Sequence, residues 1–262
     1  MALVELEVDA STGIAKVVLN RPEVLNAIDV PMARAIRDAI VPLGQRDDVR
    51  CIVLAGAGKA FVAGGDVARF ADDFETATEV IDQLLDALHP AIETLANHDA
   101  PVLASVRGAV AGAGLSLLAG CDLVVATEDS RFLMAYDRVG APPDCGGTWF
   151  LPRKIGVRNA AELMLLGQAW DAARALQAGL VNKVVAPSQL DEETNAWATR
   201  LAQRPTRALG AYKRLVAQAA HTPLNAHLEA ERDAFKRATR SADFREGVTA
   251  FLQRREPVFT GR

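Results

Sequence analysis

Short apolar, β-branched segments alternate with longer segments of helical periodicity through residues 1–187, and this alternation constrains the fold more than any other feature. The strand-like runs lie at residues 4–8, 14–19, 51–54, 102–106 and 123–126. Residues 31–43 and 79–95 carry an apolar residue at every third or fourth position, which is the period of an amphipathic helix. Strands that alternate with helices pair mostly in parallel. We therefore predict an α/β core domain over residues 1–187.

Prolines modify the two helices expected in this core. Pro31 suits the first turn of its helix, where a backbone N–H would have no partner in any case. Pro90 lies inside the second helical pattern, where it removes a hydrogen-bond donor. We expect a kink or an interruption there.

After Pro187 the strand-like runs stop, and Ala, Leu, Glu, Gln and Arg dominate. Helical periodicity continues almost to the end, with helices expected at residues 190–202, 207–220, 224–240 and 244–253. We predict that residues 188–262 form a helical part that caps the core and makes oligomer contacts.

Charge and cysteine usage exclude several classes of protein. The formal net charge of −4 gives no basis for nucleic-acid binding. The longest apolar stretch, residues 107–122, is shorter than the ~18 residues of a membrane span. Acids at Glu5, Glu7 and Asp9 stand where a signal peptide would be basic. Three scattered cysteines predict reduced thiols, and the histidines lack metal-ligand spacing. We expect a cytoplasmic protein without nucleic-acid, membrane or metal partners.

Two segments rich in Gly and Ala follow strand candidates, at residues 61–66 and 107–115. Nucleotide-binding motifs fail at both: Lys59 is followed by no Ser or Thr, and Leu117 replaces the third glycine of the dinucleotide fingerprint. Small residues at a strand-to-helix turn can instead present unpaired N–H groups to a ligand. Two such turns could hold one thioester oxygen as negative charge develops. Taken singly, each segment is explained better as a tight turn.

Taken in order, the motifs carry a resemblance over nearly the whole chain. Residues 20–27 read N-R-P-x-x-x-N-A, residues 61–66 read F-x-A-G-x-D, and residues 101–114 read P-V-x-A-x-V-x-G-x-x-x-G-x-G. Further matches follow at residues 146–148, 166–167, 178–181 and 256–259. This set resembles the enoyl-CoA hydratase/isomerase (crotonase) superfamily.

The resemblance implies a ClpP-like spiral of β-β-α units, with residues 188–262 as a helical trimerisation region. It also implies a homotrimer or a dimer of trimers that acts on an acyl-CoA thioester. Coenzyme A is then part of the substrate, and no separate cofactor is expected. By match to the motifs, the amides of Ala63 and Ala113 would form an oxyanion hole. Leu25 and Ala27 would lie near the CoA nucleotide, together with Phe251 from the C-terminal region.

Carboxylates distinguish the reactions of this superfamily. Its hydratases resemble one another in using two glutamates, which by motif position would fall at Ser116 and Tyr136. Neither residue supplies a carboxylate, so we place both in the substrate pocket as non-acids. Asp144 matches the position of the catalytic aspartate in some family isomerases, and one carboxylate suffices to move a proton between two carbons. The structural alternative for Asp144 is an N-cap of a helix near residues 146–150, and Asp137 is a weaker catalytic candidate.

The favoured function is therefore an acyl-CoA isomerase, similar to the phenylacetate-pathway subgroup that opens a CoA-bound ring epoxide and shifts a double bond from the 3,4 to the 2,3 position. Three alternatives stay open. One is a hydratase with unusual residues, and another is an aryl-CoA dehalogenase that pairs His89 in the pocket with Asp144. The third is a non-catalytic acyl-CoA-binding subunit. Acyl-chain preference would depend on residues 70–88, which carry no motif.

Overall fold

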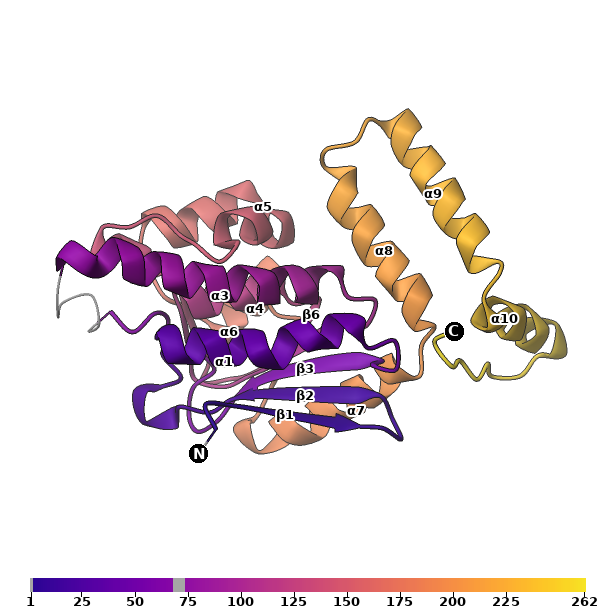
Figure 1. Ribbon diagram of the computed structural model, residues 1–262, viewed down its shortest axis with the longest axis horizontal. Coiled ribbons are helices and arrows are strands. Elements are labelled where there is room, and N and C mark those ends of the chain that lie inside the picture. The colour runs from indigo at the N-terminus through magenta and orange to yellow at the C-terminus, as the bar shows by residue number, and fades with distance from the viewer. Residues whose placement is uncertain (1, 68–73) are drawn as a thin grey trace.

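The computed structural model describes residues 2–67 and 74–262. Its strands are β1 (Val4–Asp9), β2 (Ile14–Leu19), β3 (Cys51–Gly56), β4 (Val102–Val106), β5 (Ala109–Ala111), β6 (Leu123–Thr127), β7 (Arg131–Leu133), β8 (Trp170–Asp171) and β9 (Lys183–Val185). Six of them form one sheet in the order β1-β2-β3-β4-β6-β9, and three form a small sheet in the order β5-β7-β8. Among the described strands of the large sheet, only β1 and β2 pair antiparallel. The predicted α/β architecture with largely parallel pairing is confirmed (Figure 1).

The helices surround the large sheet and continue beyond it. They are α1 (Val30–Ile40), α3 (Ala77–Asn97), α4 (Ala113–Gly120), α5 (Gly147–Leu165), α6 (Ala172–Ala178), α7 (Leu190–Ala202), α8 (Thr206–Ala219), α9 (Leu224–Ala238) and α10 (Ala242–Gln253). Short 3₁₀ helices are η1 (Pro22–Val24), η2 (Val41–Gln45), η3 (Phe74–Thr76), η4 (Tyr136–Val139) and η5 (Pro187–Gln189). Asp29 begins α1, because its carboxylate accepts a hydrogen bond from the Met32 N–H at 2.9 Å.

α3 is not interrupted at Pro90 but continues through it to Asn97, and a kink at Pro90 stays a prediction. A proline inside a helix leaves the carbonyl four residues earlier without its N–H partner. Here that carbonyl belongs to Asp86, and both Asp86 and Pro90 lie on the exposed side of α3. Water can therefore satisfy the free carbonyl, and the helix tolerates the proline.

The side chains of the central strands alternate between two layers of core. In β3, Ile52 and Leu54 join the large apolar cluster that contains the inner faces of α1 and α3. Cys51 and Val53 point to the other face, where they pack with Leu190 and other residues of α7. α7 therefore belongs to the core although it lies beyond residue 187. The boundary at residues 187 and 188 stays a prediction.

The three helices α8, α9 and α10, here called the C-terminal arm, extend away from the sheet (Figure 1). Lys213 of α8 anchors the arm: its Nζ lies 2.8 Å from the Asp122 carboxylate, and its side chain is 9% exposed. The same ammonium donates to the carbonyl groups of Leu95 and Ala100, each at 3.2 Å. Of the helices in residues 2–67 and 74–262, none is long and apolar enough to cross a bilayer.

Candidate active site

Two turns at the carboxyl ends of β3 and β4 lie against each other. We call residues 61–66 the first turn and residues 107–113 the second turn. Val62 pairs with Val110 in a parallel bridge, and the Ala111 N–H donates to the Val62 carbonyl at 2.9 Å. A methyl group added to Gly64 would lie 3.3 Å from the Ala111 carbonyl oxygen. Gly64 and Gly112 have φ values of 108° and 50°, a backbone conformation that favours glycine at both positions.

The loop of residues 20–29 holds the other side of the first turn. The Ala63 N–H donates to the Leu25 carbonyl at 3.0 Å, the Ile28 N–H donates to the Gly64 carbonyl at 2.8 Å, and the Asp66 N–H donates to the Ile28 carbonyl at 2.9 Å. The Ala63 amide is therefore already used inside the protein. The prediction that Ala63 forms the oxyanion hole is wrong, because its N–H points to the loop and not to a substrate.

The amide of Gly65 is the available donor of the first turn. In a trans peptide unit, the C=O and the following N–H point in opposite directions. Because the Gly64 carbonyl faces Ile28, the Gly65 N–H points away from the loop, toward the side where the second turn lies. It has no hydrogen-bond partner among the described residues. Sequence motifs alone could not distinguish Ala63 from Gly65, because both lie in the same small-residue segment.

Ala113 supplies a matching amide from the second turn. It is the first residue of α4, so its N–H has no partner within the helix. The Gly112 carbonyl accepts hydrogen bonds from Leu115 at 2.9 Å and Ser116 at 3.1 Å, and it therefore points into the helix. The Ala113 N–H, in the same peptide unit, points outward. Its role as an oxyanion donor stays a prediction, now paired with Gly65.

Buried polar side chains hold the first turn in this shape. Nη1 of Arg21 lies 3.1 Å from the Asp66 carboxylate and 3.2 Å from the Asp29 carboxylate. Asn26 is fully buried and donates to the carbonyl groups of Ala60 at 2.9 Å and Phe61 at 3.0 Å. Arg21 and Asn26 thus have a structural role, since they fix the direction of the backbone amides in the first turn.

The three residues predicted to contact CoA do not come together within one chain. Leu25 and Ala27 lie half-buried in the loop, beside the first turn at the carboxyl ends of the strands. Phe251 is 82% exposed on α10. The arm lies near the amino ends of the strands, opposite the two turns (Figure 1). Arg50, which directly precedes β3, donates to the Phe259 carbonyl at 3.3 Å. Contacts from Leu25 and Ala27 stay predictions, and a contact from Phe251 requires a second copy of the chain.

Asp144 lies in the segment between η4 and α5, and its carboxylate has a side-chain partner. The Tyr136 hydroxyl donates a hydrogen bond to Oδ1 of Asp144. The N-cap of α5 is Gly146, with a φ of 78°, and no side chain caps the helix. The structural alternative for Asp144, a helix cap, is therefore excluded.

Ser116 completes a cluster with Tyr136 and Asp144. It lies one helical turn after Ala113 and is fully buried, and its hydroxyl has no well-formed hydrogen bond with any described residue. A methyl group on Gly147, the first residue of α5, would lie 2.4 Å from the Ser116 oxygen. The structure thus brings together the three residues that the sequence placed at separate motif positions, next to the amino end of α4.

The electrostatics of this cluster exclude two other bases. Burial, followed by the charge of Asp144, raises the pKa of Tyr136 above its ordinary value, and the nearby Ser116 hydroxyl opposes this rise. Burial, again followed by Asp144, raises the pKa of the Cys145 thiol. Both groups stay protonated at neutral pH, so neither acts as a base or a nucleophile.

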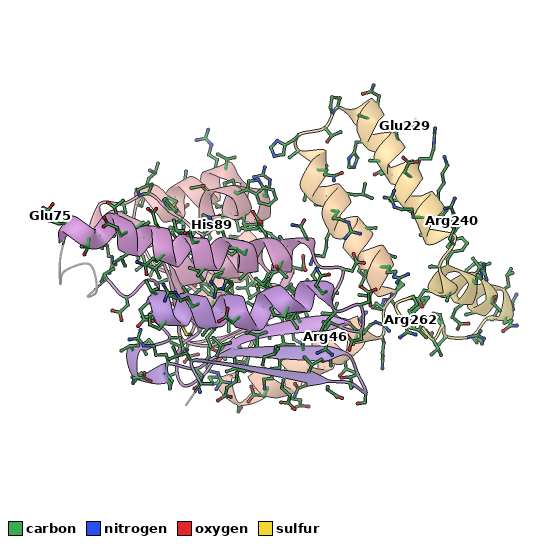
Figure 2. The ribbon with its side chains drawn as sticks, in the orientation of Figure 1. Arg46, Glu75, His89, Glu229, Arg240 and Arg262 are labelled. Carbon is green, nitrogen blue, oxygen red and sulfur yellow. The ribbon has the colours of Figure 1, made fainter. Side chains whose placement is uncertain are left out.

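His89 does not join this cluster. It lies on the exposed side of α3 (Figure 2), one position after the buried pair Ala87 and Leu88. No hydrogen bond or ion pair links it to Asp144 among the described contacts, so the pairing expected for a dehalogenase is not formed. Residues 70–73 of the predicted chain-length segment lie outside the described residues. Within the described part of the chain, no three His, Cys, Asp or Glu residues are grouped as a metal site would require.

Comparisons with known proteins agree with this architecture. The model of the enoyl-CoA hydratase/isomerase family matches residues 9–262. The chain is 38% identical over 251 residues to the 1,2-epoxyphenylacetyl-CoA isomerase of Escherichia coli, covering 95% of this chain and 96% of that protein. It is 33% identical to the trans-2-decenoyl-[acyl-carrier-protein] isomerase of Streptococcus mutans, covering 98% of each.

A solved structure gives the same result for the fold. The crystal structure of an enoyl-CoA hydratase from a Polaromonas species matches with a TM-score of 0.90 at 34% identity. The match covers 98% of this chain and 99% of that one. The similar proteins thus include isomerases and a hydratase on one fold, and the chain belongs to the enoyl-CoA hydratase/isomerase family.

Proposed function

We propose that this protein is an acyl-CoA isomerase that moves a double bond from the 3,4 to the 2,3 position or opens a ring-epoxide CoA ester. The observation that carries the proposal is the placement of Asp144: its carboxylate caps no helix and lies in a cluster with Ser116 and Tyr136. The named isomerases among the similar proteins support the same reaction class.

In the proposed mechanism, the thioester oxygen lies between the N–H groups of Gly65 and Ala113. Asp144 removes a proton from C2 of a 3-enoyl thioester, and the electron pair moves through the carbonyl group onto its oxygen. The two amides stabilise this negative charge, which develops only as the proton leaves. Asp144 then returns the proton to C4, which gives the 2-enoyl ester without loss or gain of atoms.

A hydratase is the second candidate, because the family contains hydratases and one of known structure is similar to this chain. Hydration requires a group that activates water in addition to one that handles the C2 proton. Ser116 and Tyr136 supply no carboxylate for that purpose, so the cluster favours the isomerase. A non-catalytic acyl-CoA-binding protein would need no carboxylate in this place.

The proposal is tested with purified protein and two substrates, a 3-enoyl-CoA and a 2-enoyl-CoA. We expect the 3-enoyl ester to gain the absorbance of a conjugated thioester without a change in mass. Asp144→Asn should reduce kcat at least about 100-fold, in the range typical of a lost acid–base group. The matched control is Asp137→Asn, since Asp137 is exposed beside Gly167 and should be dispensable. A product heavier by one water, or turnover indifferent to Asp144, would contradict the proposal.

We also propose that the protein assembles as a trimer or a pair of trimers through its C-terminal arm. A cavity of about 700 Å³ opens between α8, α9 and α10. Large apolar side chains of the arm are exposed in the single chain; they include Val216, Phe235, Phe251 and Leu252. Exposed apolar surface of this extent is typical of an interface between proteins.

A further inference from the structure

We infer that Tyr136 is a positioning residue, which holds the Asp144 carboxylate by Oδ1 and leaves Oδ2 to exchange the proton with the substrate. This inference rests on the proposed function, in which Asp144 is the acid–base group. It assigns to Tyr136 a task different from lining the pocket.

The first support is the contact itself and the way Tyr136 is held. Its hydroxyl donates to Oδ1 of Asp144, and its ring packs partly buried against the apolar core. The preceding Ala135 has a φ of 62°, a left-handed conformation that few non-glycine residues adopt. Both backbone groups of Tyr136 form hydrogen bonds. Its N–H donates to the Met134 carbonyl at 2.9 Å, and its carbonyl accepts from the Ala141 N–H at 3.1 Å. The hydroxyl is therefore presented from a fixed support.

The second support is the backbone on the side of Asp144. Cys145 and Gly146 follow it with φ values of 51° and 78°, so two consecutive residues are left-handed. The Gly147 N–H donates to the Asp144 carbonyl at 2.9 Å and closes this turn. With the main chain fixed, the freedom that remains is the rotation of the carboxylate about its own side-chain bonds. The hydrogen bond from Tyr136 restricts that rotation.

The third support is the surroundings of the carboxylate. η4 contributes the Tyr136 hydroxyl, the Asp144 turn contributes the Cys145 thiol, and α4 contributes the uncharged Ser116. No Lys, Arg or His of the described residues forms an ion pair with Asp144. Hydrogen bonds to a charged group are stronger than those between neutral groups. Tyr136 is thus the group that orients the carboxylate from outside its own turn.

The hydrogen bond from Tyr136 determines which carboxylate oxygen of Asp144 exchanges the proton with the substrate. A base that serves two carbons of one substrate in turn must keep the same atom within reach of both. When Oδ1 is held by a hydrogen bond, the position of Oδ2 is nearly fixed. This positioning lowers the entropy cost of the proton transfers. Without the hydroxyl, the carboxylate would sample rotations in which neither oxygen faces the substrate.

The test compares Tyr136→Phe with Tyr212→Phe. The chain has two tyrosines, and Tyr212 is 66% exposed on α8, so the second variant is a matched control for loss of a phenolic hydroxyl. We expect Tyr136→Phe to lower kcat about 10- to 100-fold, the effect of losing one hydrogen bond to a charged group. Binding of a non-isomerisable saturated acyl-CoA, measured by calorimetry, should stay within about twofold.

A double-mutant cycle separates positioning from a merely structural role: in the Asp144→Asn background, Tyr136→Phe should have little further effect on turnover. In the wild-type background, Tyr136→Phe should lower kcat with KM nearly unchanged, while Tyr212→Phe changes neither.

The outcomes are distinguishable from failure of the proposed function. Unchanged kcat in Tyr136→Phe overturns the inference while Asp144 can still be essential. A loss of kcat that persists in the Asp144→Asn background, together with weaker acyl-CoA binding and a lower melting temperature, shows a structural tyrosine and also overturns it. If Asp144→Asn is fully active, the proposed function itself fails.

Discussion

At the scale of single residues, the unpaired N–H groups of the two turns determine where negative charge on the thioester oxygen can be stabilised. The N–H of Gly65 is the one to test. Gly65→Pro removes its N–H, and we expect kcat to fall at least about 100-fold, as for the loss of one oxyanion donor. Gly65→Ala keeps the N–H, and its methyl group meets no protein atom within 4 Å, so it should lose much less. Steady-state kinetics with circular dichroism checks both. Equal losses in the two variants would contradict the role of the donor.

The same residue shows what the sequence could and could not predict about the site. Asp144, Ser116 and Tyr136 were found by counting along motifs, because motif order preserves position along the chain. The choice of Ala63 failed, because the direction of an amide depends on which carbonyl its neighbours face. That direction is set by contacts of the first turn with Leu25 and Ile28, about 40 residues away in the chain.

At the scale of elements, His98 joins the end of α3 to its neighbours and makes the fold sensitive to acid. Its Nε2 donates to the Leu43 carbonyl of η2 at 3.0 Å, and its Nδ1 accepts from the Ala100 N–H at 2.9 Å. Burial is the main cause that lowers the pKa of this imidazole below its ordinary 6.5, so the folded protein holds it neutral. The unfolded chain binds the proton more readily, and stability is therefore lost as pH falls below about 6.5.

We expect the melting temperature of the wild-type protein to drop between pH 7 and pH 5 by more than that of His98→Gln. The control is His89→Gln, because His89 is exposed and bonds no described group, and this variant should follow the wild type. A His98→Gln variant with the same pH response as the wild type would contradict this account.

The elements also show which parts of the fold a sequence reveals. Six helices and the five strand-like runs were predicted within a few residues, whereas α5 (Gly147–Leu165) was not, because glycine and proline interrupt its sequence pattern. The strands β5, β7, β8 and β9 have two or three residues each, too few to show a period. They exist because neighbouring segments offer backbone partners, as Ala109–Ala111 does for Arg131–Leu133. The sequence could not show that α3 continues through Pro90, since the tolerance of a proline depends on which side of the helix faces water.

At the scale of the whole molecule, the proposed assembly through the C-terminal arm leads to a test of its exposed apolar side chains. Leu252→Glu places a charge on a side chain that is 75% exposed in the single chain, so the fold of one chain should be unaffected. A buried contact between copies would oppose that charge, and we expect the variant to shift toward monomers in light scattering coupled to size-exclusion chromatography. The control Val157→Glu, which is 73% exposed on α5 of the core, should keep the wild-type mass. A Leu252→Glu protein with the wild-type mass would argue against assembly through the arm.

The opposite placement of the turns and the arm has a consequence for how such a chain can evolve. The residues proposed to stabilise charge and move protons follow the carboxyl ends of the parallel strands, whereas the arm attaches at Arg50 and Lys213 near the amino ends. A substitution at the carboxyl ends therefore touches none of these contacts of the arm. Selection could exchange the residues around Asp144, and with them the reaction, without altering the attachment of the arm.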